Sequence, residues 1–150
     1  MKKISLVIFV CTLTAAAFSF GQTAERLERI SERDQITVGE AAYIAAASGG
    51  LISETDSEAT AFDALFEADE SPAVAADERV SLGLYAHMLM TAFERDGGLL
   101  YSLFPGPRYA FRELEFERVI QGGGDPGDSV DGRRALQMVT RMRAIAEQEQ

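Results

Sequence analysis

The chain has 150 residues and carries 24 acidic against 14 basic side chains, a formal charge of −10. Because binding to nucleic acid or to anionic membranes depends on cations that neutralise phosphate groups, this balance argues against both and favours a partner with a basic surface. The length suits a single domain with its own hydrophobic core.

Residues 1–21 have the parts of a secretory signal peptide. Lys2 and Lys3 precede an apolar run of about fifteen residues, shorter than the roughly 18 or more expected of a membrane-spanning helix, and small residues follow at Ser19 and Gly21. A retained membrane anchor is the alternative. We therefore expect a periplasmic or secreted protein whose mature domain covers residues 22–150 and has no transmembrane segment once the signal is cleaved.

Removal of this segment would change the chemistry that the chain can support. Both lysines and the single cysteine, Cys11, lie within it, so residues 22–150 hold twelve arginines against the same 24 acidic residues, a formal charge of −12. Without a cysteine, the mature chain would have no disulfide, thiol nucleophile or thiolate metal ligand. Val10 stands where lipidation of Cys11 would need a small residue, which argues against a lipoprotein.

The first predicted pair of helices covers residues 24–48. A stripe of apolar residues indicates an amphipathic helix at its start. Thr37 and Glu40 then form a capping box for a second helix that is apolar on nearly all sides, which predicts a central, buried position. Gly49 suits the left-handed conformation that ends a helix.

The second pair covers residues 57–95. Its first helix has an apolar stripe behind a capping box of Thr55 and Glu58. Its second helix starts at Ser81, whose hydroxyl would accept hydrogen bonds from the amides of the first turn, and Gly97 would end it. This helix is also mostly apolar, so we expect it to lie beside the first apolar helix in the core, with the amphipathic helices around them.

The third pair covers residues 108–146. Pro107 is preorganised for the first position of a helix over 108–120, which the glycines after Gln121 would end. We expect Ser129 to start the last, amphipathic helix. Its arginines largely face outward: Arg133, Arg134, Arg141 and Arg143.

Three parts of the chain share a pattern that indicates internal repeats. The segments TVGEAAYIAAASGGLI and SLGLYAHMLMTAFERDGGLL both run from a hydroxyl residue through an apolar stretch to Gly-Gly-Leu, and SVDGRRALQMVTRM is a weaker copy. Their starts are 44 and 48 positions apart, which is typical of stacked supersecondary units. Strand signals are confined to short pieces near Gln35–Ile36 and Arg79–Val80. The sequence predicts an all-α fold, a small globular bundle of five to six helices in three helix-loop-helix units.

This layout resembles the S-layer homology modules of bacterial cell surfaces over about residues 24–146. The segment TVGE at 37–40 stands where that family has Thr-Arg-Ala-Glu; Val38 replaces the polymer-binding arginine, and the starts at Ser81 and Ser129 lack it too. The resemblance implies a helical architecture and binding of a wall polymer or glycan. The tract Pro-Gly-Pro-Arg-Tyr-Ala is similar to that of small uncharacterised spirochaete envelope proteins. This likeness implies a periplasmic location and does not point to any particular activity.

Residues suited to catalysis or metal binding are few. His87 is the sole histidine and lies on a largely apolar segment without a histidine or cysteine partner, so we expect a structural role. Acidic neighbours such as Glu67 and Asp69 are explained by chance among 24 acidic residues rather than by a glycosidase pair. The stretch 125–132 has acids three apart and Leu136 where an EF-hand needs glutamate, so we interpret it as a turn before a helix. We expect no catalytic residue, metal or cofactor.

The segment GGLLYSLFPGPRYAFRELEF, residues 97–116, gathers aromatic rings and arginines around Pro-Gly-Pro. Packing of one helix against the next explains much of it. The chain would leave a buried helix through apolar residues that need covering: Leu99, Leu100, Leu103 and Phe104. After the proline turn, Phe111 and Leu114 would pack inward. Aromatic faces beside arginines at a rigid corner are also typical of protein interfaces and carbohydrate sites. We hypothesise a binding patch of five residues: Tyr101, Phe104, Arg108, Tyr109 and Arg112.

Three functions remain open at this point. The first is a non-catalytic cell-envelope protein that binds another envelope protein through this patch. The second is a wall-polymer or glycan-binding module, as the S-layer homology resemblance implies. The third is an unrecognised envelope enzyme, for which the residues give no positive signal.

Overall fold

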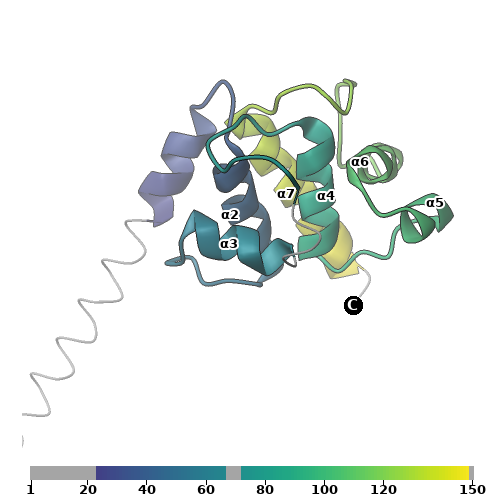
Figure 1. Cartoon of the computed structure of the whole chain (residues 1–150), viewed down its shortest axis with the longest axis horizontal. Coiled ribbons are helices and arrows are strands. Elements are labelled where there is room, and N and C mark those ends of the chain that lie inside the picture. Colours follow the sequence, from purple (N-terminus) through teal and green to yellow (C-terminus); the bar gives the residue numbers. More distant parts are fainter. Residues whose placement is uncertain (1–22, 67–71, 149–150) are drawn as a thin grey trace, which may run out of the picture.

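The computed structural model describes residues 23–66 and 72–148, so the predicted signal peptide lies outside the described residues. All named elements of the described ranges are helices, which confirms the all-α prediction (Figure 1). A helical segment over residues 23–31 comes first. It is followed by α2 (Val38–Gly49), α3 (Glu58–Leu65), α4 (Leu82–Ala92), α5 (Leu99–Leu103), α6 (Pro107–Phe116) and α7 (Gly132–Gln148). None of the helices in these ranges is long and apolar enough to span a bilayer.

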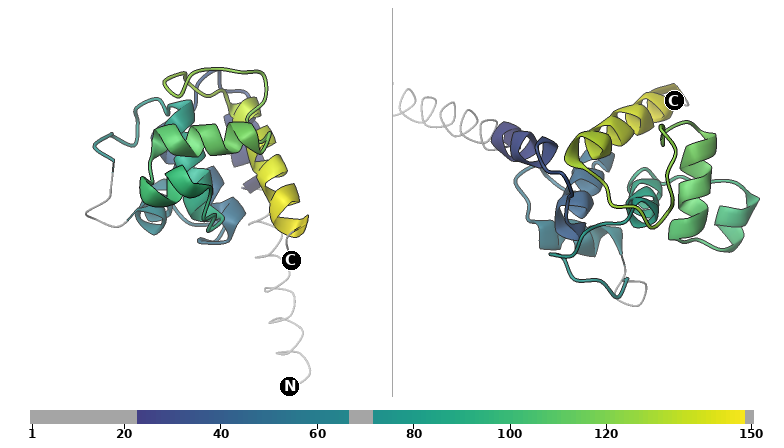
Figure 2. Two further views of the ribbon diagram at one scale, coloured as in Figure 1. Left: turned by 90° about the vertical axis from the view of Figure 1, so that its right-hand side faces the viewer. Right: turned by 90° about the horizontal axis from the view of Figure 1, so that it is seen from above.

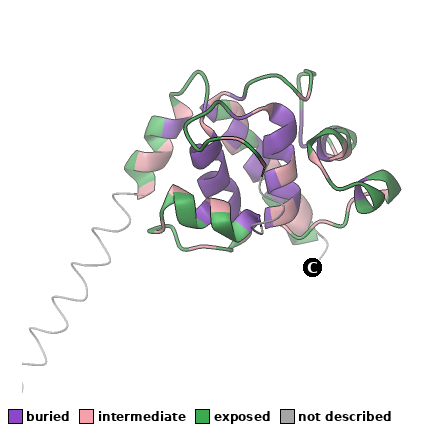
Figure 3. Ribbon diagram, in the orientation of Figure 1, coloured by how far each residue is buried: buried purple, intermediate pink, exposed green. Residues whose placement is uncertain are grey.

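Helices α2 and α4 form the centre of the molecule. They pack against each other, and α3 covers α2 while α6 covers α4. Helix α7 lies on the other side of α2 from α3, as the views from the front and from above both show (Figures 1 and 2). Burial follows this order, because α2 and α4 are buried along most of their length whereas α3, α5 and α6 expose an outer face (Figure 3). The expectation that the two nearly all-apolar helices lie centrally is confirmed.

Small residues let the central helices approach closely. Helix α2 is rich in buried alanines, and the α-carbon of Gly49 at its end lies against the backbone carbonyl of Ala92, where a β-carbon would overlap. Two tyrosines in the core keep a hydrogen bond for their hydroxyls, as buried tyrosines usually do. Tyr43 donates to the carbonyl of Glu54 at 2.7 Å, and Tyr85 donates to the carbonyl of Ala135 at 3.0 Å.

Three loops meet at the amino-terminal ends of α2, α4 and α7, and they satisfy the first-turn amides of these helices in a closed cycle. The loop before α4 supplies carbonyls to the start of α2, the loop before α7 supplies them to the start of α4, and the loop before α2 supplies one to the start of α7. The amides donate as follows: Val38 to Glu78 (2.8 Å), Gly39 to Ala76 (2.9 Å), Leu82 to Asp128 (2.7 Å), Gly83 to Pro126 (2.8 Å) and Gly132 to Arg33 (2.9 Å).

An apolar residue of each loop lies at the centre of this cycle. Ile36, Val80 and Val130 have no exposed surface. Their backbones are joined, because Ile36 donates to the carbonyl of Val130 at 2.9 Å and Val80 donates to the carbonyl of Ile36 at 3.1 Å. The pieces with weak strand signals therefore form isolated antiparallel bridges between loops, Thr37 with Arg79 and Ser81 with Ser129.

The predicted caps of α2 and α4 are confirmed. Thr37 and Glu40 form the full capping box, with the Thr37 hydroxyl accepting from the Glu40 amide at 3.2 Å and the Glu40 carboxylate accepting from the Thr37 amide at 2.9 Å. The hydroxyl of Ser81 accepts from the amide of Leu84 at 3.2 Å. Each capping residue directly follows one of the buried loop residues. The residue that starts the helix and the residue that anchors its loop in the core are therefore neighbours in the sequence.

The predicted start of the last helix at Ser129 is wrong. The bridge to Ser81 holds Ser129 in the loop, and its hydroxyl accepts a hydrogen bond from the side chain of Gln35 at 3.1 Å. The chain runs two residues further before it turns into α7. There the carboxylate of Asp131 accepts from the amide of Arg134 at 2.8 Å and takes the capping role.

Three other predicted helix ends are shifted. The start of α3 is capped by Ser57, which accepts from the Thr60 amide, rather than by Thr55. The left-handed residue after α2 is Gly50, with φ 80°, because Gly49 is needed for the close approach to α4. After α4 the first left-handed residue is Glu94, with φ 50°, and Gly97, which is left-handed as predicted with φ 63°, lies in the loop beyond the helix end.

Replacing Gly132 by alanine tests the close contact at the start of α7. A β-carbon there would overlap the carbonyl oxygen of Ile30, so the loop and helix must move apart. We expect Gly132→Ala to lower the free energy of unfolding by about 2 to 3 kcal/mol, measured by urea denaturation. The matched control is Gly106→Ala, because Gly106 has φ 169° and no atom within 4 Å of the new β-carbon. Equal stability of the two variants would contradict the close packing.

Burial of Tyr85 predicts a loss of stability at high pH. The side chain is fully buried, and burial raises the pKa of its phenol far above the ordinary value of 10.0. The unfolded chain therefore releases a proton above about pH 10 that the folded chain keeps, so the free energy of unfolding falls with rising pH by about 1.4 kcal/mol per unit for this group.

The variant Tyr85→Phe separates this effect from general alkaline damage. It removes the hydroxyl that donates to the Ala135 carbonyl, so we expect about 1 kcal/mol lower stability at neutral pH and a shallower fall above pH 10. The control Tyr109→Phe, at a half-buried surface position, should follow the unmodified protein. Parallel alkaline curves for both variants, from denaturation titrations at each pH, would count against the burial argument.

A candidate docking surface on helices α5 and α6

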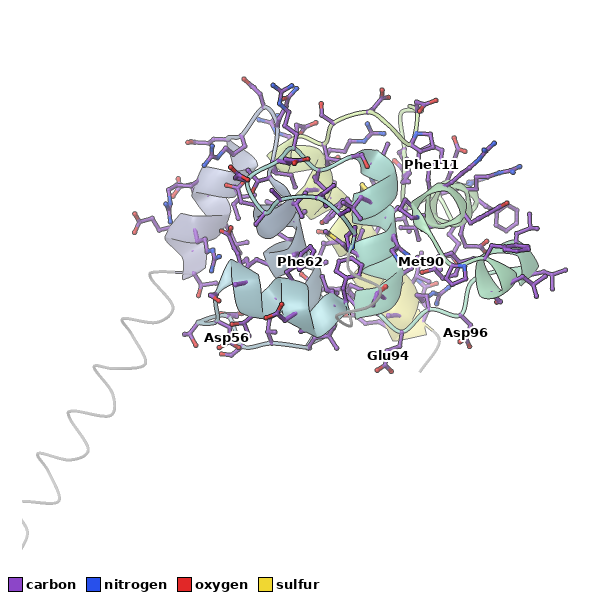
Figure 4. The ribbon with its side chains drawn as sticks, in the orientation of Figure 1. Asp56, Phe62, Met90, Glu94, Asp96 and Phe111 are labelled. Carbon is purple, nitrogen blue, oxygen red and sulfur yellow. The ribbon has the colours of Figure 1, made fainter. Side chains whose placement is uncertain are left out.

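The turn between α5 and α6 is set by its sequence. Pro105-Gly106-Pro107 ends the short α5 segment, and Pro107 takes the first position of α6, where its missing amide costs nothing. The inner face of α6 then packs on α4 through its buried residues, and Phe111 lies between the two helices (Figure 4). The prediction that Phe111 and Leu114 pack inward is confirmed.

The far end of α6 is fixed by an ion pair. Arg95, just after α4, donates to the carboxylate of Glu117, just after α6, at 2.6 Å, and both side chains are more than four-fifths buried. This contact joins the carboxyl-terminal ends of the two helices. The outer face of α6 is therefore presented on a rigid element rather than on a loose loop.

The outward face of α6 carries the arginines and rings of the predicted patch. Arg108 and Arg112 are exposed one turn apart and form no ion pair within the described ranges. Tyr109 is half-buried, and its ring centroid lies 6.2 Å from that of Phe104, which is 62% exposed. Phe116, seven residues after Tyr109 and so on the same side of the helix, is 85% exposed.

Helix α5 adds apolar side chains to the same region. It has five residues, and its leucines are more than half exposed. Among the described residues, five of the six exposed large apolar side chains belong to α5, its cap and α6, and the sixth is Leu51. We call the following set the α5–α6 surface: Leu99, Leu100, Leu103, Phe104, Arg108, Tyr109, Arg112 and Phe116.

Tyr101, the remaining member of the predicted patch, points the other way. Its side chain is 7% exposed, and its hydroxyl lies 3.0 Å from Nδ1 of His87 on α4. Burial raises the pKa of Tyr101, and a hydrogen bond with Thr91 lowers it by less. Tyr101 thus attaches α5 to α4, and the structure places the other four patch residues at the surface.

His87 takes part in packing between elements. Its ring lies 5.9 Å from the ring of Tyr101 and 5.9 Å from that of Phe66, measured between centroids. In the described ranges no group of three or more histidine, cysteine, aspartate or glutamate side chains is placed to hold a metal ion. The chemistry that the described residues bring together at α5 and α6 is apolar contact and arginine hydrogen bonding.

Four residues of the surface were missed by the sequence argument. Leu99, Leu100 and Leu103 were expected to be covered as the chain leaves a buried helix, and Phe116 was left out of the patch. The signal that could have found the leucines is the length of the segment, because six residues between Gly-Gly and Pro-Gly-Pro are too few to give a helix a buried face along several turns.

No protein-family model matches the chain, and neither a curated protein nor a solved structure matches it. The resemblance to S-layer homology modules therefore stays a prediction from a short motif. The geometry of the α5–α6 surface is therefore what points to a function.

Proposed function

We propose that the chain is a non-catalytic protein of the cell envelope that binds another envelope protein through the α5–α6 surface. The observation that carries the proposal is the concentration of exposed large apolar side chains on α5 and α6, while the rest of the described surface holds one, Leu51. A cluster of this kind beside arginines is what protein interfaces use for their central contacts.

The number of anchors is enough for specific binding. Full burial of one leucine or phenylalanine side chain is worth about 1.5 to 3 kcal/mol, and five such side chains are exposed here. Association and side-chain ordering cost much of this gain, so the surface supports a specific contact of moderate affinity. Aliphatic side chains offer no hydrogen bond to sugar hydroxyls, which favours a protein over a glycan as the occupant.

The charge of the chain bears on the partner. A net negative protein speeds the approach of a partner with a basic surface, although the contact itself would be apolar. Arg108 and Arg112 lie at the edge of the apolar cluster, where a carboxylate of the partner could accept two parallel hydrogen bonds from a guanidinium.

The proposed location rests on residues 1–21, whose pattern supports export through a signal peptide to the periplasm or beyond.

The same proposal includes a fold built from three related helix-loop-helix units, about 24–48, 57–95 and 108–146. The closed cycle of backbone hydrogen bonds supports it, because each capped helix receives its partners from the loop that precedes another capped helix.

The double variant Phe104→Ala with Arg108→Ala tests the docking surface. Both side chains are exposed and neither contributes to the buried core, so we expect the melting temperature to change by no more than about 2 °C. Loss of one apolar anchor and of one arginine at its edge should together weaken partner binding at least about tenfold. The readout is crosslinking in cells followed by mass spectrometry of the captured protein.

The matched control is Leu51→Ala, which removes the one exposed large apolar side chain found elsewhere in the described residues. It should leave capture of the partner unchanged. An equal loss of partner capture in the double variant and in Leu51→Ala would contradict docking at α5 and α6. Retention of the purified protein on peptidoglycan sacculi stripped of proteins, with no partner captured in cells, would favour the wall-polymer alternative instead.

A further inference from the structure

Charge is distributed very unevenly along this chain. Residues 51–66 and 72–78, the described part of the chain around α3, hold six acidic residues and no lysine or arginine. Residues 132–146, which form most of α7, hold four arginines and no acidic residue. A chain with an overall formal charge of −10 thus has one helix whose first fifteen residues carry only positive charge, and the acidic Glu147 follows near its end.

The two regions lie on opposite sides of the molecule. Helix α3 packs on one side of α2 and α7 on the other, as the front view and the view from above agree (Figures 1 and 2). On the α3 side, Glu54 and Asp63 are exposed, and Asp56 lies at the outer edge of the molecule (Figure 4). Glu58 is less available there, because it pairs with Arg26 at 3.1 Å.

Two arginines of α7 bind backbone carbonyls, and one acidic residue, Asp131, lines the same hollow as Arg133 and Arg141. Arg134 donates from Nη2 to the carbonyl of Gly123 at 2.6 Å, and Arg141 donates from Nη1 to the carbonyl of Val119 at 3.0 Å. Those partners are neutral. None of the four arginines of α7 forms an ion pair with a residue of the described ranges.

Two of the four arginines of α7 lie on one side of the helix, with a glutamine between them. Arg133, Gln137 and Arg141 follow one another at a spacing of four, so they lie on one side of α7 over about 12 Å. Two open hollows along this side, of about 460 and 410 Å³, are both lined by these three residues. We call this the α7 arginine face.

We propose that the chain associates head to tail with a second copy of itself, the α7 arginine face of one copy contacting the acidic α3 side of the next. Charge complementarity selects this occupant, because the α3 side supplies carboxylates to arginines that form no ion pair within the described ranges of their own copy. The two surfaces are different and face opposite ways, so each copy keeps one free after the first contact. Such a heterologous contact builds rings or open filaments rather than closed dimers.

The net negative charge of each copy does not prevent this contact at physiological ionic strength. The Debye length is about 8 Å at 0.15 M salt, which is shorter than the roughly 25 Å length of a 17-residue helix such as α7. Charges that face each other across the contact therefore dominate over distant like charges. The association should weaken as salt rises further.

Sedimentation velocity of the protein, purified in the form that cells accumulate, tests the proposal. At 0.15 M NaCl we expect assembly that grows with protein concentration, and about tenfold weaker association at 0.5 M. Arg133→Glu with Arg141→Glu, and separately Glu54→Arg with Asp63→Arg, should each abolish assembly. An equimolar mixture of the two double variants should restore it, because the exchanged charges again face opposite charges.

The control is Arg108→Glu with Arg112→Glu, which makes the same charge change at two exposed arginines of α6 and should leave assembly intact. Circular dichroism confirms that each variant is folded. The proposal is overturned if the protein is monomeric at both salt concentrations up to about 100 μM, a concentration at which contacts of micromolar affinity are populated. It is equally overturned if the α7 variant assembles normally, or if mixing restores nothing.

Discussion

The structure depends on how the buried starts of three helices satisfy their backbone amides. The first amides of a helix have no partner within it, and leaving one buried and unpaired costs about 1 to 3 kcal/mol. Here α2, α4 and α7 begin close together around Ile36, Val80 and Val130, away from water. Carbonyls from the neighbouring loops accept hydrogen bonds from these amides. The loop before α4 serves α2, the loop before α7 serves α4, and the loop before α2 serves α7, which closes the cycle. No one of the three helices can shift without breaking bonds to a loop that positions another.

The closed cycle of hydrogen bonds also explains which helix faces remain exposed to solvent. Once α2 and α4 are fixed at the centre, α3, α6 and α7 have one helix side each to bury and one to present. The chain between α4 and α6 is too short to add another packed helix, so Tyr101 attaches α5 while the leucines beside it stay in solvent. The apolar α5–α6 surface and the basic α7 arginine face therefore arise at separate places and for separate reasons. The two contacts proposed for them use separate residues.

Local signals predicted the parts of the fold that local chemistry decides. The hydroxyls of Thr37 and Ser81, and the apolar runs after them, indicated two central helices correctly. The same reasoning failed at Ser129, because a bridge to Ser81 from 48 positions earlier holds that residue in the loop and passes the cap to Asp131. It also grouped buried Tyr101 with the surface residues of the patch. Neither outcome is visible in a short window of sequence, since each depends on a distant partner.

Hydrogen exchange at the helix starts tests the account most directly. Amides in the first turn of a helix ordinarily exchange fast because they lack intrahelical partners. If the loops satisfy them as described, Gly39, Gly83 and Gly132 should exchange as slowly as amides in the middle of α2 and α4, with Arg108 at the exposed start of α6 exchanging fast. Fast exchange at all three glycines, in a protein whose central helices remain protected, would contradict the closed cycle.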